Sequence, residues 1–162
     1  MEPREWFMFF HFVGLGLIAT MLTTAWLLQR QYKSASDYST KSVILNSGRL
    51  VGMLSPFAIL LILISGIGNM SVRDLEFTTE TWLTVKICLF LVAMVNGIVF
   101  GIRSKKRGML VGQMAKGTPP ENAEKTLAGM DRYSLIFLIV QTILIIVILA
   151  LAVWKPGTSR GA

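Results

Sequence analysis

The chain has 162 residues, of which 53% are hydrophobic, and its mean hydropathy is +0.60. This composition is too apolar for an ordinary soluble domain, and the apolar residues are gathered in long runs. The formal net charge is +7, and a basic chain of this kind could bind nucleic acid. Here, however, the basic residues directly flank the apolar runs, which favours contact with anionic lipid. We therefore expect an integral membrane protein whose partner is the lipid bilayer and not a nucleic acid.

Four runs reach the length of about 20 residues that a helix needs to cross a bilayer. They cover residues 6–28, 50–70, 82–102 and 135–154. The first run lacks a basic leader and a small-residue cleavage site, so we expect it to stay in the mature protein. The single cysteine, Cys88, lies inside the third run and excludes an intramolecular disulfide. The sequence predicts an all-α polytopic protein, with one four-transmembrane-helix bundle over residues 1–162.

Charge placement predicts the orientation of this bundle. The segments 29–49 and 103–134 carry most of the lysines and arginines, whereas the segment between the second and third runs carries Asp74, Glu76 and Glu80 against Arg73. By the positive-inside rule, the two basic segments are cytoplasmic loops. Both termini are then expected outside, and we predict a multi-pass protein of the bacterial inner membrane with periplasmic or extracellular ends.

Small and polar residues predict how the helices pack. Gly48 and Gly52 form one G-x-x-x-G pattern and Gly97 and Gly101 form another, at similar depth in the second and third runs, so these two helices are expected to be neighbours. Pro56, after Ser55, should kink the second helix. Further expectations are a hydrogen bond between Asn96 and Gln141 and a helix that starts near Pro119, with Thr118 as its cap and Glu121 closing a capping box.

Two polar side chains stand inside apolar runs. Lys86 lies about one turn into the third run, where an ammonium costs about 2.5 kcal/mol or more unless it finds water, a partner or a ligand. His11 lies in the first run, and both runs enter from the same side. At about 1.5 Å per residue, the two residues lie roughly 6 to 8 Å below the outer interface.

We therefore predict a polar pocket that opens outward and contains His11 and Lys86. Ser65 and Asn69 reach the same level from the second run, with Gly66 and Gly68 leaving room beside them. The alternative is that His11 and Lys86 have only structural roles. In that case Lys86 extends to the outer headgroups and His11 bonds only to a neighbouring helix.

Several short motifs resemble those of a group of small predicted bacterial membrane proteins of unknown function. They are Phe10-His11-Phe12-Val13-Gly14, Arg49, Ser55-Pro56, Ser65-Gly66, Trp82-Leu83-Thr84-Val85-Lys86 and Trp154-Lys155-Pro156-Gly157. That group is itself similar to the HemJ-type protoporphyrinogen oxidases and to the membrane domain of CopD-type copper-resistance proteins. The resemblance implies a b-type haem and activity at a first-helix histidine and a third-helix lysine, which are His11 and Lys86 here.

Three functional classes remain open on the sequence. A porphyrinogen oxidase or a b-type haem protein would use His11 with Lys86, a methionine or an open position, because the chain has one histidine. Copper handling would use the soft donors Met8, His11 and Met70. The third class is a small subunit without chemistry of its own, and the absence of acidic residues inside the four runs argues against an autonomous pump.

We expect the third class. The chain is then a non-enzymatic accessory subunit that packs against other membrane protein subunits of a larger respiratory, photosynthetic or transport complex. The alternative is a HemJ-like haem-binding or porphyrinogen-oxidising membrane protein that uses His11 and Lys86. Segment 25–30 and Asn96 depart from the HemJ-type pattern, which favours the accessory subunit. No catalytic residue and no metal ligand is assigned.

Overall fold

The computed structural model describes residues 2–72 and 80–154, which contain five α-helices and no strand. The helices are α1 (Pro3–Ser34), α2 (Tyr38–Gly52), α3 (Ser55–Val72), α4 (Thr81–Ala115) and α5 (Ala123–Trp154). Four segments are long and apolar enough to cross a membrane: α1, α2 together with α3, α4, and α5. The expected four-span, all-α, multi-pass membrane protein is confirmed. Arg73, Asp74, Glu76 and the motif residues 155–157 lie outside the described residues.

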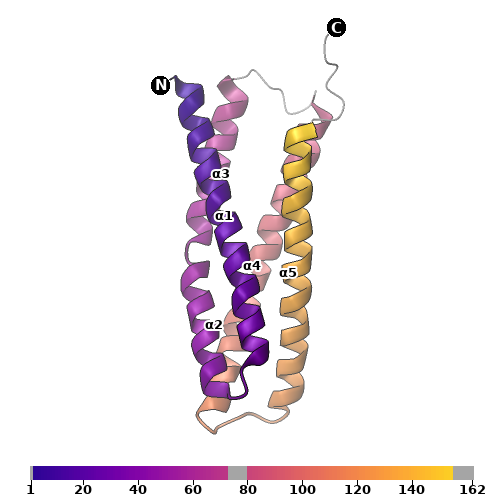
Figure 1. Cartoon of the computed structure of the whole chain (residues 1–162). Helices are drawn as coiled ribbons and strands as arrows, with labels where there is room; N and C mark the ends of the chain where they lie inside the picture. Colours follow the sequence, from indigo (N-terminus) through magenta and orange to yellow (C-terminus); the bar gives the residue numbers. More distant parts are fainter. Residues whose placement is uncertain (1, 73–79, 155–162) are drawn as a thin grey trace.

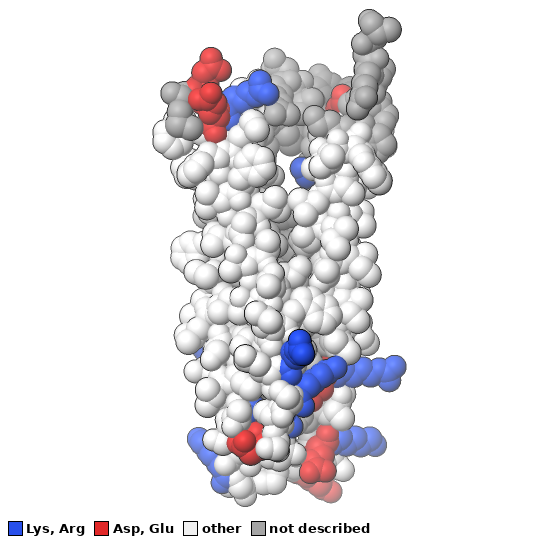
Figure 2. Space-filling view, in the orientation of Figure 1, with Lys and Arg blue, Asp and Glu red and all other residues white. Residues whose placement is uncertain are grey.

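The bundle is elongated and has two different ends (Figure 1). The turns at residues 35–37 and 116–122 lie at one end, which we call the basic end. The start of α1, the end of α3, the start of α4 and the end of α5 lie at the other, the terminal end. Figure 2 shows most lysines and arginines near the basic end and a broad uncharged band between the two ends. Exposed leucine, isoleucine, valine and phenylalanine side chains form much of that band, as expected for a surface in contact with lipid.

The helices associate as two extensive pairs, α1 with α3 and α4 with α5. α2 contacts both α1 and α4, and so joins the pairs toward the basic end. The buried apolar cluster of the bundle lies there, formed by Leu110, Val111, Ala123 and Leu127 with Tyr38, Leu45, Met114 and Met130 packed against it. This buried cluster therefore lies at the basic end, where α2, α4 and α5 meet.

The second span is interrupted as the proline predicted. α2 ends at Gly52 and α3 begins at Ser55, with a turn at Met53 and Leu54 between them. The Met53 N–H donates to the Arg49 carbonyl at 3.2 Å, and the Leu54 N–H donates to the Val51 carbonyl at 3.1 Å. The Met53 bond still has the helical i−4 spacing, whereas the Leu54 bond has the tighter i−3 spacing directly ahead of Ser55 and Pro56, and Pro56 has no N–H to donate.

The two basic segments are mostly helical, so the loops are shorter than the ranges 29–49 and 103–134 suggested. The expected helix start at Pro119 is wrong, because α5 begins at Ala123. The Thr118 hydroxyl donates to the Gln113 carbonyl at 3.4 Å and does not cap α5. Gly117 at φ 74° and Asn122 at φ 58° reverse the chain, and both residue types tolerate this left-handed conformation. α5 then runs without a break into the fourth span.

Glycine does bring two helices together, but not at the expected positions. A Cβ added to Gly14 of α1 would lie 2.8 Å from Ile62 Cγ1, and one added to Gly68 of α3 would overlap the Phe7 ring. A Cβ at Gly97 or Gly101 would meet no described atom within 4 Å. The second and third runs were expected to be neighbours, and the contact is made mainly by α2 with α4, because α3, which forms most of the second run, pairs with α1. Gly97 and Gly101 make no close helix contact within the described chain. Gly52 is equally open, while a Cβ added to Gly48 would lie 3.4 Å from Leu28 Cδ1, which is ordinary van der Waals contact.

Candidate functional site

The His11 ring is held by a serine on the neighbouring helix. His11 Nδ1 of α1 lies 2.9 Å from Ser65 Oγ of α3, and Ser65 is almost fully buried at 1% exposure. The Ser65 hydroxyl donates its single hydrogen to the Leu61 carbonyl one turn back. With the hydroxyl hydrogen in this bond, Ser65 Oγ would accept from His11, and Nδ1 would carry the proton of the neutral ring. This leaves the lone pair of Nε2 available to a ligand.

Lys86 and Asn69 lie in the same half of the bundle. The Lys86 ammonium of α4 is close enough to His11 for a charge interaction with the ring. Asn69 Oδ1 of α3 is buried and has no hydrogen-bond partner among the described residues. His11 and Ser65 are thus in contact, with Lys86 in electrostatic range, while a shared pocket around the four residues stays a prediction. Among the described residues, no three His, Cys, Asp or Glu side chains gather as a metal site.

The phenylalanines beside His11 face different surroundings. Phe7 packs over Gly68, whereas Phe9, Phe10 and Phe12 are 41 to 63% exposed. Phe10 also stacks on Trp6, with 5.9 Å between ring centroids. Exposed aromatic rings near the end of a span are typical of the lipid interface.

The expected fastener between the third and fourth spans is present. Asn96 Nδ2 donates to Gln141 Oε1 at 3.0 Å, and Gln141 Nε2 donates to the Ala93 carbonyl at 3.4 Å. A second polar contact joins α1 to α5, where the Trp26 indole N–H donates to Thr142 Oγ1 at 3.0 Å. Both pair polar groups that would otherwise face hydrocarbon.

A buried polar cluster at the basic end was not predicted from the sequence. Its centre is Arg107 of α4, which is only 4% exposed. Arg107 Nε donates to Asp131 Oδ1 at 2.7 Å, and Nη1 donates to Ser134 Oγ at 3.1 Å and to Gln29 Oε1 at 3.5 Å. The guanidinium also lies 4.0 Å from the centroid of the Tyr32 ring. We call these five residues the Arg107 cluster.

The Arg107 cluster joins three segments that are distant in the sequence. Gln29 and Tyr32 come from α1, Arg107 from α4, and Asp131 and Ser134 from α5. The pairing is nevertheless incomplete, because Arg107 Nη2 is buried without a hydrogen-bond partner among the described residues. Asp131 balances the charge of the guanidinium, while Nη2 keeps unused hydrogen-bond donors.

The sequence held a signal for this cluster. Arg107 stands in the run Lys105-Lys106-Arg107, which predicts a solvated basic loop beside the membrane. Leu110, Val111 and Met114 continue the helical spacing of apolar residues beyond it, and all three pack in the core. Extending the helix along that pattern would have turned Arg107 inward, while Lys105 and Lys106 remain exposed.

Comparisons of the chain with protein-family models, curated proteins and solved structures found no match.

Proposed function

We propose that the protein is a non-enzymatic accessory subunit of a larger membrane complex. The observation that carries the proposal is a row of open glycines on α4: Gly97, Gly101, Gly108 and Gly112. A Cβ added at any of these four positions would meet no described atom within 4 Å. The row gives another helix a surface on which to pack.

The spacing places these glycines on one face. Their intervals are four, seven and four positions, which at about 100° per residue keeps them within an arc of about 60°. The row extends over about 22 Å of helix axis at about 1.5 Å per residue. Lipid tails gain nothing special from a smooth helix face, whereas a second helix approaches more closely and gains van der Waals contact.

The same chain uses glycine in this way internally. At Gly14 and Gly68 the α1 and α3 surfaces approach so closely that a methyl group would clash. The α4 row has the same residue type, and no described helix packs on it as closely. We infer that a helix of another subunit covers it, in the manner in which α3 covers Gly14.

The experiment is co-purification from native membranes in a mild detergent. Gly101→Leu should lower recovery of the partner subunit several-fold while the chain still folds, because the leucine enters open space. Gly16→Leu is the matched control, since Gly16 of α1 is also exposed and also open. Equal recovery with both variants would contradict the proposal. So would a cross-link at the row that joins two copies of this chain in place of a different subunit.

The second candidate is a HemJ-like haem-binding membrane protein, and the His11 geometry favours it. The Nδ1 contact with Ser65 at 2.9 Å orients the ring and leaves Nε2 as a donor, which is how axial histidines are commonly held. The residues fit haem as one imidazole ligand, with Lys86 as the nearby cation that would face a propionate or the iron. Bound haem would supply one-electron chemistry, while His11 and Ser65 would fix its position.

An absorption spectrum of the purified protein distinguishes the two candidates. An accessory subunit should be colourless, and His11→Ala should leave partner recovery unchanged. A haem protein should show a Soret band that is lost in His11→Ala and shifted but retained in Ser65→Ala, because the second change frees the ring without removing the donor. A stoichiometric haem lost on His11→Ala would overturn the accessory proposal.

We also propose that the basic end is cytoplasmic and that the membrane is the bacterial inner membrane. The grouping of lysine and arginine at one end (Figure 2) supports this through the positive-inside rule. Cysteine labelling in a Cys88→Ala background tests the orientation. Lys41→Cys and Lys106→Cys should be protected from an impermeant reagent in intact cells, and Glu5→Cys should react. Labelling at position 106 would reverse the assignment.

A further inference from the structure

A cavity lies between α4 and α5 at the basic end. It has a volume of about 310 Å³, which is at the small end of the range for ligand sites. Three cations line it, which are Arg103, Lys106 and Arg107, together with hydroxyl groups that include those of Ser104, Thr126 and Tyr133. Among the described residues, no Asp or Glu lines it. A concave site with this lining favours an anion with several oxygen atoms.

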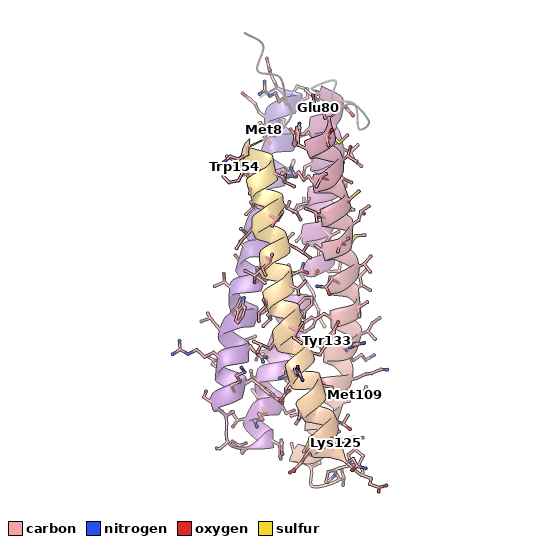
Figure 3. All side chains as sticks on the ribbon, turned by 90° about the vertical axis from the view of Figure 1, so that its right-hand side faces the viewer. Met8, Glu80, Met109, Lys125, Tyr133 and Trp154 are labelled. Carbon is pink, nitrogen blue, oxygen red and sulfur yellow. The ribbon has the colours of Figure 1, made fainter. Side chains whose placement is uncertain are left out.

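The cations around this cavity are partly positioned in advance. The Arg103 guanidinium lies over the Tyr133 ring, 4.1 Å from its centroid. Figure 3 shows Tyr133 near the basic end, on the same part of the bundle as Met109 and Lys125. Arg107 is locked by the Arg107 cluster, and its Nη2 is still without a partner among the described residues. Asp131 balances the charge of Arg107, so Arg103 and Lys106 supply the excess positive charge at the cavity.

The depth of the cavity matches a headgroup layer. Its residues begin at Phe100, next to the end of the apolar run of α4, and Phe100 stacks on Phe137 of α5 at 3.7 Å. Ile102 and Ile136 beside this stack are exposed. An anion in the cavity would therefore have apolar surface on its membrane side and polar groups on its water side, as a phospholipid phosphate does.

We propose that this cavity is a specific site for the phosphate of an acidic phospholipid. Arg103 and Lys106 pair with the phosphate oxygens, and the Ser104 and Thr126 hydroxyls donate to the remaining oxygens or to the glycerol. The acyl chains lie along the exposed apolar faces of α4 and α5. Free inorganic phosphate shares the oxyanion chemistry but not the acyl chains.

The experiment measures lipid binding to the full chain in detergent by native mass spectrometry. Phosphatidylglycerol should bind at least about tenfold more tightly than phosphatidylcholine, and the preference should weaken with salt. Arg103→Gln with Lys106→Gln should reduce the affinity for phosphatidylglycerol roughly tenfold. Lys105→Gln with Arg132→Gln is the control, because it removes two exposed charges from the same end but neither residue lines the cavity.

A second variant tests the cavity without changing charge. Gly129 lines the cavity, and a Cβ there would meet no described atom within 4 Å, so the side chain of Gly129→Leu begins in open space and extends from the lining of the cavity. It should block phosphatidylglycerol, while Gly16→Leu should not. Equal loss in the charge variant and its control, or equal binding of both lipids, would overturn the proposal. Binding of inorganic phosphate as tight as that of phosphatidylglycerol would overturn the lipid assignment and leave a site for a soluble phosphate.

Discussion

The two ends of the bundle hold their helices together by different means. At the basic end, α1, α2, α4 and α5 meet around an apolar core and the Arg107 cluster. Toward the terminal end, α1 with α3 and α4 with α5 form separate pairs, and the closest contacts are made over Gly14 and Gly68. In Figure 2 the surface is hollowed between the pairs in that half.

This difference follows from the surroundings of each end. Near water the desolvation cost of a charged cluster is lower, because Asp131 stays 35% exposed while Arg107 is buried. In the apolar half, helices gain stability by close packing of small residues and by single hydrogen bonds. Four changes test this contrast, in order of decreasing expected effect.

Removing the carboxylate of the Arg107 cluster should cost most. Asp131→Asn keeps the shape but leaves the buried guanidinium without a counter-charge, so we expect a loss of about 2–4 kcal/mol in the free energy of unfolding. Unfolding in detergent by a chemical denaturant measures it. Glu124→Gln, an exposed acid on the same helix, should change stability by less than about 0.5 kcal/mol. If Asp131→Asn lowered stability no more than Glu124→Gln does, the ion pair would not be what holds this end together.

A methyl group at the α1–α3 crossing should have the next largest effect. Gly14→Ala places a Cβ 2.8 Å from Ile62 Cγ1 and 3.3 Å from the Ala58 carbonyl oxygen, so the helices must move apart. We expect a loss of about 1–3 kcal/mol, measured by the same unfolding assay. Gly16→Ala, two positions along the helix, meets nothing within 4 Å. Equal stabilities for the two alanine variants would contradict close packing as the contact that joins α1 and α3.

The hydrogen bond between His11 and Ser65 should contribute less. Ser65→Ala removes the acceptor for Nδ1, and bonds of this kind between membrane helices contribute about 0.6 kcal/mol, with a maximum of about 1.7 kcal/mol. Ser71→Ala is the comparison, because Ser71 of α3 is exposed and its described hydrogen bond, to the Ile67 carbonyl, lies within its own helix. The ring of His11 should also gain mobility in Ser65→Ala, which its NMR linewidth reports. An unchanged ring would show that other contacts orient it.

The smallest effect concerns Asp37, the cap of α2 at the basic end. The Thr40 N–H donates to Asp37 Oδ1 at 2.7 Å and lowers the pKa of this exposed carboxyl below its usual value of 3.8. A lowered pKa in the folded state stabilises the fold above the pKa of the unfolded chain, and the contribution is lost as the pH falls through the folded value. Unfolding from about pH 6 to about pH 2 should therefore show the native chain losing stability relative to Asp37→Asn only below about pH 4. A constant difference across that range would contradict the capping bond.

The sequence predicted the spans better than the sites. Apolar runs of the right length, the interruption before Pro56 and the Asn96–Gln141 hydrogen bond depend on local pattern or matched depth, and all three are present. To predict the Arg107 cluster, one must know which face of α4 is buried beyond the end of the span. A count of charges does not contain this information, because it treats all lysines and arginines of that segment as solvated. The open face at Gly97 and Gly101 depends on rotation about the helix axis, which spacing alone does not determine.

The length of α4 gives the protein a reach beyond the bilayer. Its 35 residues extend about 52 Å, whereas the hydrocarbon layer is about 30 Å thick. About 20 Å of helical hairpin, with an apolar cluster that includes Val111 and Leu127, therefore extends past a layer of that thickness at the basic end. Because α4 and α5 run unbroken from this hairpin into the spans, a displacement of the hairpin would be transmitted into the membrane-spanning part of both helices.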